Sequence, residues 1–210
     1  MVRPKRQDAR RADLVEAALS AVSERGLRSI SLTDVAQRAG LTRGAILYYY
    51  SDLDELLVEA HRAGVERFCD ARDDLIASLD DPRDQLAVAI RAGLPDGPDD
   101  ALMRLLYEFD ILAGTSALHD EMVERMYRRQ LATYTGVLQR GLDLGVFVPT
   151  LDLPTLAMTL VALEDSYGLH IVGGNSLITV DDAEQAMRRV SGQLGAPAEK
   201  GHIASEPGEA

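Results

Sequence analysis

The sequence predicts an all-α protein in which a small head of three short helices precedes a larger helical domain. Apolar residues recur every three or four positions over most of the chain, and no segment shows the alternating pattern of a half-buried strand. Capping residues and helix-ending glycines divide this pattern into three short and about six longer helices. The chain has 210 residues, 46% of them hydrophobic, which is enough to form a core.

Residues 31–50 contain the pattern of two helices joined by a tight turn. Ser31 and Asp34 have the spacing of a capping box, so a helix is expected over residues 32–39. Gly40 should end this helix, because glycine adopts the left-handed conformation without steric cost. The turn then leads directly into the second helix.

This second helix follows a cap at Thr42 and has two different faces. At about 100° per residue, Ile46 and Tyr50 share the face that points to the core. The other side lacks the Glu and Lys of an ordinary solvated surface, and it suits a helix pressed against bases and phosphates. It consists of Arg43, Gly44, Ala45, Leu47 and Tyr48.

At these residues the chain resembles the TetR family of bacterial transcriptional regulators, and the resemblance covers residues 10–57. It implies a helix-turn-helix that binds double-stranded operator DNA, followed by a helical domain that binds a small-molecule effector and dimerises. The positions that correspond to the family's amino-terminal signature are Leu14, Ala17, Ala18, Gly26, Ser31, Val35, Ala36, the run from Ala39 to Thr42 and the run from Gly44 to Tyr50.

The chain departs from this signature at several positions that contact DNA in the family. Leu47 stands where the family usually has a phosphate-contacting tyrosine, and Leu53 where it has a phosphate-contacting lysine. Tyr49 and Tyr50 replace a histidine and a phenylalanine. Contacts to the DNA backbone are therefore expected from Arg43, Tyr48, Tyr49 and the basic amino terminus.

The amino-terminal residues 1–9 are basic, show no apolar periodicity and are expected to form a flexible arm. Two interpretations are open, a solubilising terminus or a clamp on the phosphates or the minor groove beside the docked helix. The residues expected to contact DNA are Arg3, Lys5, Arg6, Thr33, Thr42, Arg43, Gly44, Ala45, Leu47, Tyr48 and Tyr49.

Charge is divided unevenly along the chain, which as a whole carries a net charge of −12. Residues 1–50 hold nine Arg or Lys against five Asp or Glu, a net charge of +4, whereas residues 51–210 carry −16. A basic head on an acidic body can present one face to phosphate while the rest is repelled. The asymmetry therefore favours DNA as a partner of the head alone.

The predicted helices outside the helix-turn-helix cover residues 10–25, 52–79, 82–93, 99–115, 118–144, 153–172 and 181–194, with a loop over residues 94–100. The long helix 52–79 is expected to tie the head rigidly to the rest. The predicted domains are the arm and helix-turn-helix (1–51), an effector-binding and dimerisation domain (52–194) and a disordered tail (195–210).

A homodimer is expected through the last two helices, which the resemblance implies form a four-helix interface with their copies. Both helices carry apolar stripes, Leu153, Leu156, Ala157, Leu160 and Val161 on one and Ala183, Ala186, Met187 and Val190 on the other. The alternative, that the same stripes belong to the core of a single chain, is equally compatible with their periodicity.

The chain shows no motif for catalysis, for a cofactor or for a metal. It has no phosphate-binding glycine loop, no paired Glu-x-x-His, no His-Glu-x-x-His and no nucleophile elbow, so an enzyme is not expected. The single cysteine rules out an internal disulfide and fits a reducing compartment. With no signal peptide and no membrane-spanning apolar run, the protein is expected in the cytoplasm, without a membrane partner.

Acidic residues interrupt two of the most apolar predicted helices, 99–115 and 153–172. A buried carboxylate costs several kcal/mol unless a cation compensates it. These acids either pair with Arg104, Arg128 or Arg129 across a helix contact, or line a pocket for an organic cation such as a polyamine. The predicted ligand-binding residues are Tyr107, Glu108, Asp110, Tyr134, Glu164, Asp165, Tyr167 and His170.

Taken with the resemblance, these features predict a ligand-responsive transcriptional regulator, a repressor that a small molecule releases from a palindromic operator. Two other classes are weighed against it. A nucleoid-type DNA binder would have a uniformly basic surface, which the acidic body contradicts. A helical enzyme or small-molecule carrier with a vestigial helix-turn-helix would need a site that no motif indicates.

Overall fold

A computed structural model of the chain describes residues 3–110, 114 and 117–198, and every regular element in this part is a helix. In chain order the elements are α1 (Arg3–Arg25), the 3₁₀ helix η1 (Leu27–Ser29), α2 (Leu32–Ala39), α3 (Arg43–Ile46), α4 (Leu53–Ala77), α5 (Pro82–Gly93), α6 (Ala101–Asp110), α7 (Ala117–Asp143), α8 (Leu153–Val172) and α9 (Val180–Gln193). The predicted all-α class is confirmed. No helix of the described residues is long and apolar enough to span a bilayer.

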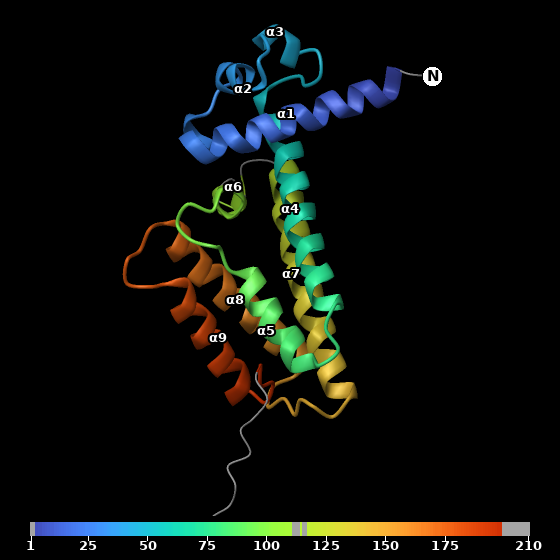
Figure 1. The fold of residues 1–210 in the computed structure, drawn as a ribbon, viewed down its shortest axis with the longest axis vertical. Coiled ribbons are helices and arrows are strands. Elements are labelled where there is room, and N and C mark those ends of the chain that lie inside the picture. Colours follow the sequence, from blue (N-terminus) through green and yellow to red (C-terminus); the bar gives the residue numbers. More distant parts are fainter. Residues whose placement is uncertain (1–2, 111–113, 115–116, 199–210) are drawn as a thin grey trace, which may run out of the picture.

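The helices form a head at one end of a longer body. Figure 1 shows α1 crossing this end, with α2 and α3 on its outer side. In the body, α4 and α7 lie side by side and lead away from the head. The helices α5 and α8 pack beside this pair, and α9 packs on α5 and α8. The short helix α6 lies under α1 and contacts it. We refer to α1–α3 as the head and to α4–α9 as the body.

The first helix begins at Arg3 and not near residue 10, so the predicted flexible arm is wrong for residues 3–9. The segment contains no glycine, and Pro4 lies in the first turn, where a missing backbone N–H breaks no helical hydrogen bond. Its other residues are mostly good helix formers. The side chains of Arg3, Lys5 and Arg6 lie outside the described part, so their contacts with DNA stay a prediction.

The helix-turn-helix forms through the local signals that predicted it. Ser31 and Asp34 make both hydrogen bonds of the capping box at the start of α2. Gly40 ends α2 in the left-handed conformation, with a φ of 64°. Thr42 then caps α3, and its hydroxyl accepts a hydrogen bond from the Ala45 N–H at 3.2 Å. Both helix ends are therefore specified locally.

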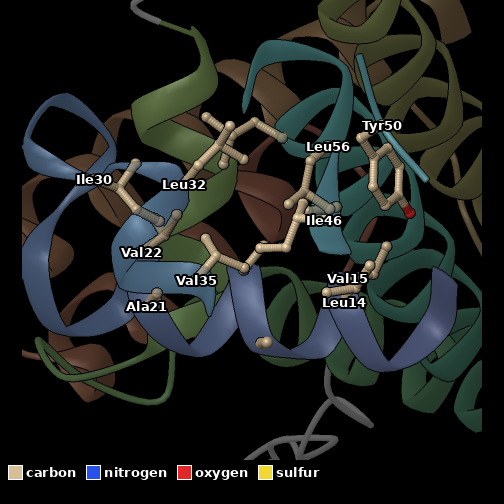
Figure 2. Packing of buried hydrophobic residues seen from close by; sticks show 14 of the residues in the cluster. Leu14, Val15, Ala21, Val22, Ile30, Leu32, Val35, Ile46, Tyr50 and Leu56 are labelled. Carbon is tan, nitrogen blue, oxygen red and sulfur yellow. The ribbon is translucent and has the colours of Figure 1, made fainter. Parts of the chain in front are cut away.

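One apolar cluster holds the head together and extends into the body. In Figure 2, Leu14, Ile46 and Leu56 lie together between α1, α3 and α4. The same cluster includes Leu105 and Phe109 of α6, neither of which has exposed surface. This core crosses the domain boundary predicted at residue 51 and couples the head to α4 and α6.

A second apolar cluster packs α5, α7, α8 and α9 against one another. It contains most of the stripes expected at a dimer interface, and Leu156, Leu160, Ala183 and Met187 have no exposed surface. These residues are core of a single chain, so the interface predicted through them is wrong. An apolar stripe has the same periodicity whether a neighbouring helix or a second chain covers it.

Packing continues past residue 194, where the disordered tail was predicted to begin. Ala196 and Ala198 are buried in the second cluster. The Val148 N–H donates to the Gly195 carbonyl at 2.9 Å, which fixes this segment against the turn after α7. Residues 199–210 lie outside the described part.

Candidate nucleic-acid interface and effector pocket

The residues predicted to contact DNA from the helix-turn-helix lie at the free end of the head (Figure 1). Tyr48 is 72% exposed and Leu47 is 42% exposed. The other predicted contacts are exposed at Thr33, Thr42, Arg43 and Gly44 and half-buried at Ala45 and Tyr49. We call the surface made by Arg43, Gly44, Ala45, Leu47 and Tyr48 the outer face. It offers a cation, a phenol and apolar groups without a carboxylate, which suits phosphates and base edges.

Arg11 of α1 fixes the turn behind the outer face, a role that no sequence pattern indicated. Its Nη1 donates to the Tyr49 carbonyl oxygen at 2.7 Å, and its Nη2 pairs with Glu59 of α4. The guanidinium carbon also lies 4.2 Å from the centre of the Tyr50 ring. A single side chain thus joins α1, α4 and the turn after α3, and so holds the outer face in place.

The two glycines of the helix-turn-helix should respond differently to an added methyl group. A left-handed residue other than glycine costs about 1–2 kcal/mol, so Gly40→Ala should lower the free energy of unfolding by about that amount. At Gly44 a Cβ would meet only Thr42 Oγ1, at 4.0 Å, so Gly44→Ala should fold normally. Its methyl group would project from the outer face and weaken DNA binding. Urea denaturation and DNA titration of both variants test this, and unchanged DNA affinity of Gly44→Ala would contradict it.

A small pocket between α6, α7 and α8 brings together three predicted ligand-binding residues, Tyr107, Asp110 and Asp165. We call it the acidic pocket; its volume is about 90 Å³. The Tyr107 hydroxyl is buried and has no hydrogen-bond partner among the residues that the structure describes. It packs against Gly168 of α8, which has no Cβ to exclude it. The other lining residues are Met103, Leu106, Val123, Met126, Tyr127 and Gln130.

The two carboxyls of the acidic pocket are difficult to ionise. Burial raises the pKa of Asp165 to about 6, although a hydrogen bond from Gln130 opposes part of the rise. Loss of hydration, together with the nearby Asp165 charge, raises the pKa of Asp110 to about 6, even though its outer side is exposed. Near neutral pH both groups are largely charged. A cation between them would offset the free-energy cost of holding two negative charges close together in a partly buried site.

Glu164 lies behind the acidic pocket in a buried ion pair. Arg72 Nη1 and Nη2 donate to its carboxylate oxygens at 3.1 and 2.6 Å, and Arg72 and Glu164 are 2% and 0% exposed. The Tyr134 hydroxyl donates to the same carboxylate at 2.6 Å. Gln130 Nε2 donates to Glu164 at 3.0 Å and to Asp165 at 2.9 Å, and so connects the ion pair to the pocket.

Sequence reasoning missed Arg72 and Gln130. Arg72 does carry a signal, because it follows Val65 and Phe68 at helical spacing on the inner stripe of α4, where a charge requires a buried partner. The arginines considered as partners of the acids bind elsewhere. Arg129 pairs with Asp70 and Asp73, Arg128 with Glu124, and Arg104 donates to the Pro98 and Val172 carbonyls.

The remaining predicted ligand-binding residues do not line the acidic pocket. Glu108 lies on the opposite side of α6, where its carboxylate accepts a hydrogen bond from the Leu27 N–H of the head. Tyr167 is half-buried against the second apolar cluster. His170 is exposed and lies 3.3 Å from the Asn175 amide nitrogen. The helix α6 therefore contacts the head with one face and the pocket with the other.

Comparison with known proteins agrees with this arrangement. Residues 14–60 match the model of bacterial regulatory proteins, tetR family. The chain is 24% identical to the HTH-type transcriptional regulator YfiR of Bacillus subtilis over 165 residues, which are 76% of this chain and 78% of that protein. It is also 24% identical to the HTH-type transcriptional repressor KstR2 of Mycobacterium tuberculosis over 145 residues, 69% and 72% of the two chains.

A solved structure with the same fold is that of a transcriptional regulator from Saccharomonospora viridis in complex with choline. The TM-score is 0.80 at 22% sequence identity, over 87% of this chain and 95% of that chain. At this identity the likeness is one of fold.

Proposed function

Since this chain belongs to the TetR family of bacterial transcriptional regulators, we propose that it is a repressor that binds a palindromic operator and releases it when a small-molecule effector binds. The observation that carries the proposal is the outer face, which presents Arg43, Gly44 and Tyr48 on a rigidly held turn. Arg43 can reach the O6 and N7 atoms of guanine, and Gly44 permits close approach. Titration of the DNA that flanks its gene, with and without an effector, tests the proposal as a whole.

We propose a homodimer through the exposed side of α8. Met158, Ala162 and Leu169 recur at helical spacing on that side, and Met158 and Leu169 are 49% and 54% exposed. Two heads about 34 Å apart could then bind the two halves of a palindrome. Light scattering at micromolar concentration should give a dimer for the wild type and a monomer for the Met158→Glu/Leu169→Glu variant. A monomeric wild type, or a variant that remains dimeric, would contradict this interface.

We propose an organic cation, such as a polyamine, as the effector of the acidic pocket. The support is chemical, since two carboxyls with raised pKa values line one small space beside Tyr107. A volume of about 90 Å³ suits one ammonium group, with the rest of the molecule leaving past the exposed Asp110. The S. viridis protein of the same fold binds choline, an organic cation. Because the similarity to the S. viridis protein is one of fold, our proposal rests on the carboxyls of Asp110 and Asp165.

The affinity for an amine should depend on pH because Asp110 and Asp165 must be ionised to bind it. With pKa values near 6, calorimetric titration with spermidine should give weaker binding at pH 5 than at pH 7.5. Without ligand, the stability of the folded state depends on pH in the opposite direction and falls as the pH rises. Both pKa values are raised, so their contribution to stability is complete below pH 3.8 and is lost as the pH rises through about 6.

Asp165→Asn should weaken spermidine binding at pH 7.5 and remove much of its pH dependence. Asp120→Asn, which changes an exposed acid at the start of α7, is the matched control and should bind like the wild type. If no amine binds, and a neutral or anionic compound releases the DNA, the acids are structural and the cationic effector is excluded.

A further inference from the structure

Leu47 is an exposed apolar side chain of the outer face. It follows α3 directly, and its N–H donates to the Arg43 carbonyl at 3.1 Å. Its side chain is 42% exposed, although the neighbouring Ile46 has no exposed surface. Among the described residues, the apolar cluster that holds the head together includes Ile46 and does not include Leu47. Leu47 therefore contributes to the surface of the head and not to its core.

Its neighbours distinguish Leu47 from an ordinary exposed leucine. Single apolar side chains are common on protein surfaces and need no partner. Leu47, however, lies one helical turn after Arg43, and residues four apart lie on the same side of a helix with their Cβ atoms about 5–6 Å apart. Tyr48, the next residue, is 72% exposed. The leucine thus lies beside the side chains that the outer face offers to DNA.

The chemistry of DNA limits what this side chain contacts. Leucine has no hydrogen-bonding atom, so it forms no hydrogen bond with a phosphate or with the polar edge of a base. Covering such an edge would leave its donors or acceptors without a partner, which is unfavourable. The C5-methyl group of thymine is the apolar group that a base pair presents in the major groove. Thymine is therefore the base whose edge complements Leu47.

We propose that Leu47 is a specificity-determining residue, and that its side chain packs on the C5-methyl group of a thymine in the major groove. This inference rests on the proposed function, because it concerns the DNA that the outer face binds. The spacing of the side chains places the thymine. The Cβ atoms of Arg43 and Leu47 are about 5–6 Å apart and successive bases of a strand about 3.4 Å, so the thymine should lie within about two base pairs of the guanine that Arg43 contacts.

DNA in which deoxyuridine replaces thymidine tests the contact, because uracil pairs with adenine and lacks only the methyl group. The duplex that flanks the gene is amplified once with dTTP and once with dUTP, and both are titrated at one salt concentration. The wild type should bind the uracil duplex about fourfold more weakly for each methyl contact, the value of one buried carbon group. Equal affinity of the wild type for the two duplexes would overturn the inference.

The Leu47→Ala variant assigns the contact to this side chain. It should bind the thymine duplex more weakly than the wild type does and should show no preference for thymine over uracil. Any effect of uracil on the stiffness of the duplex is common to both proteins and cancels in this double-mutant cycle. Leu144→Ala, which truncates a 59% exposed leucine of the body, is the matched control and should keep the full preference. An undiminished preference in Leu47→Ala would overturn the role of Leu47.

Single deoxyuridine substitutions then locate the thymine. The loss should occur within about two base pairs of the position at which Arg43→Ala loses discrimination, and a loss confined to more distant thymines would overturn the placement. The proposed function fails differently. If the wild type binds the flanking duplex no better than unrelated DNA, both the operator and the thymine contact are wrong. If it binds the flanking duplex specifically, yet equally with thymine and uracil, only the thymine contact is wrong.

Discussion

Replacing Arg72 by methionine is expected to lower the free energy of unfolding by about 3–5 kcal/mol, because it leaves the carboxylate of Glu164 buried without a counterion. Only neutral donors, from Tyr134 and Gln130, would then remain for that carboxylate. Urea denaturation measures the change. Loss of an exposed pair costs about 0–1 kcal/mol, so Arg67→Met, which separates Arg67 from Glu16, is the matched control.

The double variant Arg72→Met/Glu164→Leu separates the cost of a lone charge from the value of the ion pair. Replacing both partners by apolar residues of similar size is often close to neutral, so it should recover most of the loss. If the double variant is no more stable than Arg72→Met, the destabilisation arises from lost packing against Phe68 and Tyr134, whose rings lie 5.8 and 4.8 Å from the guanidinium carbon.

Phe109→Ala should also destabilise the protein by about 3–5 kcal/mol, the usual cost of deleting a buried phenylalanine ring. Phe109 has no exposed surface and stacks on His61 of α4, with ring centres 4.2 Å apart and planes inclined by 19°. It also belongs to the cluster that forms the core of the head. The cavity left by the missing ring would therefore loosen the junction between head and body. We expect the DNA affinity of the variant to fall along with its stability.

Thermal unfolding and DNA titration of Phe109→Ala measure these two effects. Leu177→Ala serves as the control, because Leu177 is 87% exposed and its truncation should change neither. Wild-type stability of Phe109→Ala would show that α6 does not hold the head. Lost stability with wild-type DNA affinity would show that the junction does not position the outer face.

The helix-turn-helix could be predicted because its signals are local. Ser31, Asp34, Gly40 and Thr42 act on backbone groups within four residues of themselves, so their effect does not depend on the rest of the fold. The same holds for the longer helices, whose predicted ends differ from those in the structure by at most two residues. The predicted end of helix 99–115 lies next to residues outside the described part and is not compared. The exception is α1, because its basic first residues lack the apolar periodicity by which a helix is predicted.

The interior of the body could not be predicted to the same extent, because its contacts join distant parts of the chain. Arg72 and Glu164 are 92 residues apart in sequence, and nothing local pairs them. Glu108 and Asp110 appeared equivalent as acids of one apolar helix. Two residues apart on a helix, they point to different sides, one to the head and the other to the acidic pocket.

Recognition of DNA by the outer face is tested most directly by a fluorescence-anisotropy titration of a duplex from the DNA flanking the gene, at a fixed salt concentration near 0.15 M. We expect binding that unrelated competitor DNA does not remove, a loss of about 1–3 kcal/mol at one base position in Arg43→Ala, and release on addition of spermidine. Arg128→Ala, an exposed arginine of α7 far from the outer face, should bind like the wild type. Equal affinity for the flanking and unrelated duplexes, or equal affinity of Arg43→Ala and wild type, would contradict recognition of DNA by the outer face.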